Sequence, residues 1–102
     1  MIEFKVAKNA EGQIISFVLK GHSDYSEEGS DIVCAAVSSA VWMAVNGIEA
    51  QNLGKLDYKS SDGFVECTIY NRKDSADAVL RSLELFILEL SRQYKENIKV
   101  IS

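Results

Sequence analysis

Apolar and polar residues alternate over residues 2–6 and again over 15–19, the period of a half-buried strand. Between the two runs, Asn-Ala-Glu-Gly at 9–12 predicts a turn. The chain is therefore expected to open as a β-hairpin that ends at Lys20-Gly21, which places His22 just beyond a strand end. The predicted apolar faces are made by Ile2, Phe4 and Val6 in the first strand and by Ile15, Phe17 and Leu19 in the second.

A polar segment and an apolar helix are predicted next. Residues 23–30 contain no aliphatic side chain, so we interpret them as a mobile surface loop. Asp31 is a good helix N-cap, because its carboxylate can accept hydrogen bonds from the first-turn amides. The helix then runs from about Ile32 to Ile48 and is apolar nearly all round, which predicts burial on more than one side. At 100° per residue, Cys34 shares a stripe with Ser38, Val41, Val45 and Ile48.

The second half repeats the order of hairpin and helix. Leu56 and Tyr58 indicate a short strand, residues 60–63 a turn, and residues 64–70 a strand whose apolar face is Val65, Cys67 and Ile69. Asp74 or Ser75 caps a second helix, and a last strand spans 98–101. The helical stripe is Ala76, Val79, Leu80, Leu83, Phe86, Ile87, Leu90 and Tyr94, with Leu85 and Leu88 widening it.

These elements predict one α+β domain over residues 1–102. The order is ββαββαβ, with two helices packed on one face of a mainly antiparallel sheet. No internal repeat, proline or low-complexity linker divides the 102 residues.

Composition and charge narrow the possible partners. The net charge is −4, whereas nucleic-acid binding needs clustered Lys and Arg, so a direct nucleic-acid partner is not expected. We expect no signal peptide, because Glu3 and Lys5 interrupt the opening residues, and we expect the charge-free run 32–48 to be too short for a membrane span. Two cysteines without an export signal argue against a disulfide framework, so we expect a cytoplasmic protein.

The chemistry-bearing residues flank the polar segment. His22 is the only histidine, and Cys34 falls in the first turn of the predicted helix. The positive end of a helix and a nearby imidazolium both stabilise a thiolate, which is the nucleophilic form of cysteine. Cys34 as nucleophile, His22 as general base and first-turn amides at the oxyanion would make a coherent thiol enzyme.

Each of these residues also has a purely structural interpretation. A cysteine in an apolar helix is often a small core residue, and Cys67, between Val65 and Ile69, is expected to be one. Ser38 could donate a hydrogen bond to the Cys34 carbonyl or lie beneath the thiol. For Asp31, the role of helix cap is favoured over that of an acid that orients His22. One histidine and two separated cysteines do not suggest a zinc site, and no phosphate or dinucleotide motif is present, so no cofactor is expected.

A combined motif makes the sequence recognisable. It consists of Gly21-His22, a polar loop ending in Gly29-Ser30, and the run Asp31-Ile-Val-Cys34-Ala-Ala-Val-Ser38. With this motif, the length and the order of elements, the chain closely resembles the ribosomal-processing cysteine protease family (Prp) of bacteria.

The resemblance implies a cysteine endopeptidase that removes an N-terminal extension from a large-subunit ribosomal protein. Cys34 matches the family's nucleophile and His22 its general base. Gly21, Gly29, Ser30, Asp31 and Ser38 match other motif positions and would support the site or bind substrate. The family is also described as a homodimer whose loop between the catalytic residues closes over substrate. A basic ribosomal protein would suit a chain of net charge −4.

Two other hypotheses remain at the level of sequence. A non-catalytic ribosome-assembly factor would capture a basic ribosomal protein on its acidic surface and leave Cys34 as a core residue. A thiol redox sensor would oxidise Cys34 reversibly, but no second cysteine lies close to it in sequence.

Overall fold

The computed structural model describes residues 1–22 and 31–101, and the polar segment 23–30 lies outside the described residues. The order ββαββαβ predicted from the sequence is confirmed. The elements are β1 (Ile2–Lys8), β2 (Ile14–Lys20), α1 (Ile32–Ala50), β3 (Lys55–Ser61), β4 (Phe64–Tyr70), α2 (Ser75–Gln93) and β5 (Ile98–Ile101).

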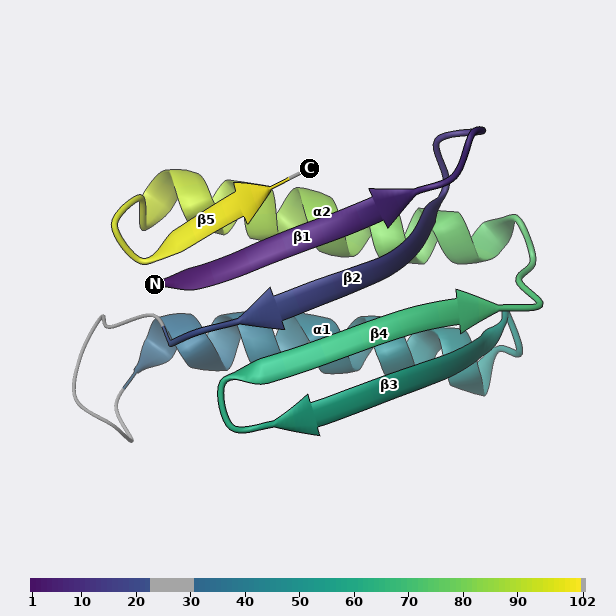
Figure 1. The fold of residues 1–102 in the computed structure, drawn as a ribbon, viewed down its shortest axis with the longest axis horizontal. Helices are drawn as coiled ribbons and strands as arrows, with labels where there is room; N and C mark the ends of the chain where they lie inside the picture. Colours follow the sequence, from purple (N-terminus) through teal and green to yellow (C-terminus); the bar gives the residue numbers. More distant parts are fainter. Residues whose placement is uncertain (23–30, 102) are drawn as a thin grey trace.

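Both helices pack side by side on one face of a five-stranded sheet (Figure 1). The strand order is β3-β4-β2-β1-β5, and among the described residues only the β1–β5 pair is parallel. The register aligns the apolar positions of neighbouring strands, so that Phe17 stands opposite both Val6 and Cys67. These side chains and one face of each helix form the core. Helix α1 and the β3–β4 half of the sheet build the site described below.

The second strand departs from simple alternation. Pairing runs from Ala7 and Ser16 directly to Lys8 and Ile14, so Ile15 is an extra residue that forms a bulge. The extra residue reverses the alternation, so Ile14 is buried and Ile15 only half-buried. The prediction that Ile15 continues the core face was wrong for this reason.

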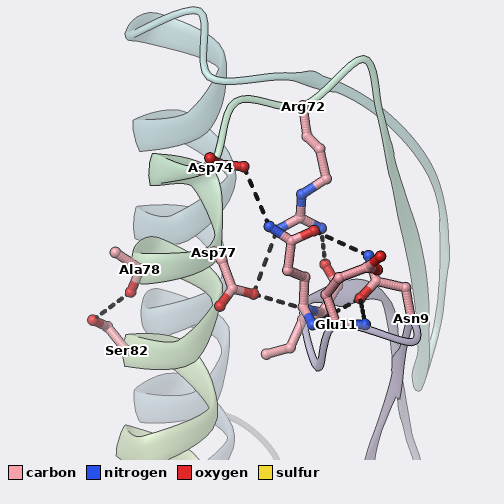
Figure 2. Close-up of polar contacts among 9 residues, drawn as sticks. Asn9, Glu11, Arg72, Asp74, Asp77, Ala78 and Ser82 are labelled. Atoms are coloured by element: carbon pink, nitrogen blue, oxygen red, sulfur yellow. Dashed lines mark hydrogen bonds and ion pairs between the residues drawn. The ribbon is translucent and has the colours of Figure 1, made fainter.

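Side chains from α2 and from the segment that precedes it bind the backbone at this bulge (Figure 2). The Asp77 carboxylate accepts a hydrogen bond from the Ile14 amide at 2.8 Å, and the Arg72 guanidinium donates to the Ile14 carbonyl. Arg72 also lies 3.4 Å from Asp77, which keeps the two side chains together. This cluster therefore fastens the β1–β2 hairpin to α2, at the opposite end of the sheet from α1's first turn (Figure 1).

Helix α1 is buried on one side rather than on more than one. Its inner residues are buried, whereas Trp42 and Met43 are exposed. By length and hydropathy alone this 19-residue helix could cross a membrane, contrary to the expectation that its apolar run is too short. In the fold its apolar inner face packs into the core against the sheet.

Helix α2 differs from its predicted stripe at two positions. Phe86 is exposed, although its spacing predicts a core residue, and Glu84 is buried among the apolar side chains. The Glu84 carboxylate lies 3.6 Å from Lys8 Nζ, which offsets the cost of burying its charge. Asp74 stands at the N-cap position without a capping bond from its side chain, which instead accepts a bond from Gln13.

Candidate active site

A pocket of about 320 Å³ opens between α1 and the strands β2, β3 and β4. Its walls combine buried apolar side chains with polar groups from three chain segments that converge at one end of the molecule. Those segments are the end of β2, the first turns of α1 and the β3–β4 turn (Figure 1). The lining residues are Ile2, Leu19, Gly21, His22, Cys34, Val37, Ser38, Val41, Trp42, Val45, Tyr58, Ser60, Ser61, Gly63, Phe64, Val65 and Cys67.

Cys34 reaches this pocket from the first turn of α1. The helix begins at Ile32 because Asp31 caps it in an extended conformation. Cys34 is half-buried, and the stripe predicted for it faces the pocket, since Ser38, Val41 and Val45 line the same space. Ser38 is exposed one turn after Cys34, so it takes a place in the wall of the pocket.

The Asp31 cap uses two of the first-turn amides. One carboxylate oxygen, Oδ1, accepts hydrogen bonds from the amides of Val33 and Cys34, both at 3.0 Å. These two are among the first-turn amides that the sequence suggested for an oxyanion. While the cap is formed they are committed to Asp31, so that part of the expected mechanism does not follow from the structure.

His22 reaches the pocket from the segment that follows β2. The preceding Gly21 has φ +96°, and its amide donates to the Gly63 carbonyl at 2.8 Å. A side chain at position 21 would start 2.2 Å from the Met1 carbonyl oxygen, so only glycine fits there. The His22 side chain is 60% exposed, and its Nε2 lies 3.9 Å from Asp62 Oδ2 in the β3–β4 turn.

The pocket also contains residues that sequence reasoning missed. Trp42 of α1 and Tyr58 of β3 meet edge to face, with ring centroids 5.9 Å apart, and both line the pocket. Tyr58 alternates with Leu56, a signal for the inner face of β3. No local pattern, however, pairs it with Trp42. Asp62 and Gly63 were predicted to lie in a turn. Their contact with His22 was not predicted, because it joins distant parts of the sequence.

The two cysteines line one pocket in different settings, and both are free thiols. Cys67 is buried in β4 as the strand pattern predicted. Burial raises the pKa of the Cys67 thiol to about 11, with smaller contributions from the Glu49 and Asp57 carboxylates. Cys67 therefore stays protonated at neutral pH and is buried, whereas Cys34 is half-buried at the start of α1.

Of the other motif residues, Gly21, Asp31 and Ser38 are found at this end of the fold. Gly29, Ser30 and the predicted mobile loop fall within 23–30, outside the described residues.

A thiol and an imidazole at one largely apolar pocket are the ingredients of a cysteine hydrolase. The family model for cysteine protease Prp matches residues 1–99. The chain belongs to this family.

Relatives and solved structures agree with the family match. The chain is 28% identical to the ribosomal processing cysteine protease Prp of Staphylococcus aureus, covering 98% of this chain and 97% of that one. It is also 28% identical to the Bacillus subtilis Prp, covering 98% and 96%.

A crystal structure of the S. aureus protease with a covalently linked product peptide matches with a TM-score of 0.93 at 28% identity, covering 98% and 97% of the two chains. A second, with a substrate peptide, matches with a TM-score of 0.87 at 27% identity, covering 99% and 98%.

Proposed function

We propose that this protein is a cysteine endopeptidase that removes the N-terminal extension of a large-subunit bacterial ribosomal protein. The observation that supports it most is that Cys34 and His22, the two motif residues, line one pocket from separate elements. Membership of the Prp family and the peptide complexes of the S. aureus relative support the same reaction class.

In the proposed mechanism, His22 takes the Cys34 proton and the thiolate attacks the scissile carbonyl carbon. The C–S bond forms, and the tetrahedral intermediate collapses as His22 returns the proton to the leaving amine and the C–N bond breaks. Water then attacks the thioester with His22 as base, the C–S bond breaks, and the released thiolate regains its proton. Asp31 acts in this scheme by fixing the first turn of α1, and therefore the thiol.

The pocket walls suggest what lies beside the scissile bond. Val37, Val41 and Val45 of α1 face the sheet across the pocket, and Trp42 and Tyr58 add aromatic surface. Such a lining favours an apolar substrate side chain over a charged one. The net charge of −4 would assist encounter with a basic ribosomal protein in the cytoplasm, more through the association rate than through affinity.

We also propose that the protein is a homodimer. Apolar side chains stand exposed on both helices, with Met43 at 67%, Leu85 at 58% and Phe86 at 44%. Leu88, which the sequence grouped with Leu85, is half-buried. A second copy covering α2 would remove Leu85 and Phe86 from water.

The decisive experiment is cleavage of the peptide bound in the S. aureus substrate complex, followed by mass spectrometry. Cys34→Ala and Cys34→Ser should abolish cleavage while leaving peptide binding measurable. Ser39→Ala is the matched control, because Ser39 is exposed on the same helix and does not line the pocket. Undiminished cleavage by Cys34→Ala would refute the mechanism. Binding of the ribosomal protein without cleavage by the parent protein would instead support the assembly-factor hypothesis.

A further inference from the structure

The imidazole of His22 lies directly against the main chain of Gly63. A β-carbon placed on Gly63 would stand 2.9 Å from His22 Nε2 and 3.5 Å from Cδ2 and from Cε1. The Nε2 edge of the ring therefore occupies the space that any other residue at position 63 would fill. Non-bonded heavy atoms essentially never lie within 3.0 Å of a β-carbon in real proteins.

The backbones on the two sides of this contact are fixed to one another. Lys20 pairs with Phe64 in the antiparallel β2–β4 ladder, and the Gly21 amide donates to the Gly63 carbonyl just beyond it. His22 follows directly, so its backbone is held close to the β3–β4 turn. The side-chain torsions of His22 then decide where the ring points. Because Gly63 has no side chain, there is room for the ring in the orientation that it has.

The Asp62 carboxylate should influence the orientation of the His22 ring less than the space at Gly63 does. Asp62 Oδ2 lies 3.9 Å from Nε2, but the Asp62 side chain is 99% exposed. Ion pairs between exposed groups contribute little, because water and salt screen them. We therefore expect the steric effect at Gly63 to exceed the electrostatic effect of Asp62.

We propose that Gly63 is the positioning residue for the catalytic base: its lack of a side chain lets the His22 ring lie over the β3–β4 turn and face the pocket. This inference rests on the proposed function of His22. A larger residue would displace the ring rather than the backbone, because a histidine side chain rotates more easily than a strand ladder shifts. The enzyme would then stay folded but hold its base in the wrong place.

The test compares Gly63→Ala with Gly12→Ala. Both glycines have positive φ angles, +71° and +81°, so each alanine carries a similar backbone strain. No described residue lies within 4 Å of a β-carbon placed on Gly12, in the β1–β2 hairpin, whereas an alanine at position 63 would crowd His22. We expect equal losses of thermal stability, a kcat lowered about 100-fold for Gly63→Ala, and no change in kcat for Gly12→Ala.

A further variant separates backbone strain from space. Asparagine tolerates positive φ better than alanine but still has a β-carbon. Gly63→Asn should therefore be more stable than Gly63→Ala and equally impaired in kcat. Asp62→Asn should stay within about threefold of the parent, as expected for a screened charge.

His22 is the only histidine, so its ring C–H signals in a proton–carbon NMR spectrum report its position without activity. In the Cys34→Ala background, Gly63→Ala should shift these signals and Gly12→Ala should not. Unshifted ring signals, a parental kcat in Gly63→Ala, or an equal loss in Asp62→Asn would each overturn the inference. Full cleavage by His22→Ala would refute the proposed function instead, whatever the ring signals show.

Discussion

The ionisation of Cys67 differs between the folded and unfolded chain, although the proposed reaction does not use this thiol. Burial raises its pKa to about 11, with help from the Glu49 and Asp57 carboxylates. An unfolded chain exposes the same thiol to water, where its pKa is 9.0. The neutral thiol therefore stabilises the fold below that pH, and this contribution is lost as the pH rises through about 11.

We accordingly expect stability to fall between pH 9.0 and about 11 by at most about 3 kcal/mol on account of Cys67. Urea unfolding of the parent and of Cys67→Ala at both ends of this range measures the effect, since other groups titrate equally in the two proteins. Cys67→Ala should start less stable and lose less. Parallel pH curves for the two proteins would contradict the assignment.

Trp42 offers a direct view of the pocket. It is the only tryptophan, is 49% exposed, and meets Tyr58 edge to face in the pocket wall. Binding of the S. aureus substrate peptide to Cys34→Ala should move its emission to shorter wavelength, because the peptide displaces water from the indole. An unchanged spectrum at peptide concentrations where calorimetry shows binding would place the peptide elsewhere.

At the scale of elements, the start of α1 combines a structural and a functional task. Asp31 Oδ1 accepts from the amides of Val33 and Cys34, so one side chain both begins the helix and fixes the residue that carries the thiol. Asp31→Ala should lower the free energy of unfolding by about 1 kcal/mol, and Asp31→Asn by much less, because asparagine also caps helices. Chemical denaturation tests this. Equal losses in both variants would show that the charge, and not the cap, is what matters.

The cluster at the other end of the sheet should affect stability alone. Arg72 donates to the Ile14 carbonyl at the bulge and lies beside Asp77 (Figure 2). None of these three residues is among the described residues that line the pocket. Arg72→Ala should cost about 1–3 kcal/mol, because the Ile14 carbonyl loses the guanidinium donor and Asp77 keeps only its bond from the Ile14 amide. Arg81→Ala, at an exposed position of α2, is the control. Cleavage by the folded Arg72→Ala protein should equal that of the parent. A lower kcat would show that the Arg72 cluster affects the active site as well as stability.

The sequence predicted the elements and their order because period-2 and helical patterns are local. It also placed His22 after a strand and Cys34 in a first turn, both from short-range signals. The bulge at Ile15 could not be predicted from the sequence, because one extra residue exchanges the two faces of a strand and leaves no mark in its amino-acid composition. The contact of Gly63 with His22 and the Trp42–Tyr58 pair could not be predicted either, because each joins residues that only the tertiary fold brings together.

At the scale of the whole molecule, the exposed apolar side chains of α2 are the reason to expect a homodimer. A homodimer through α2 would cover Leu85 and Phe86. Leu85→Lys should then shift the mass measured by light scattering from dimer to monomer at micromolar concentration. Lys95→Glu, at an exposed position outside both helices, changes charge without removing apolar area and should leave the dimer intact. A parent protein that is monomeric at high concentration would contradict the proposal.

The parallel pairing of β1 with β5 has a consequence for how the molecule forms. Ile2 pairs with Ile98, so this part of the sheet joins residues from opposite ends of the sequence, whereas both hairpins are local. Closing so long a loop is entropically costly, and contacts of large sequence separation slow folding. We therefore expect the two hairpins to form early and β5 to dock last. Until it docks, one edge of β1 has no strand partner, and folding intermediates at this stage would be open to pairing with another chain.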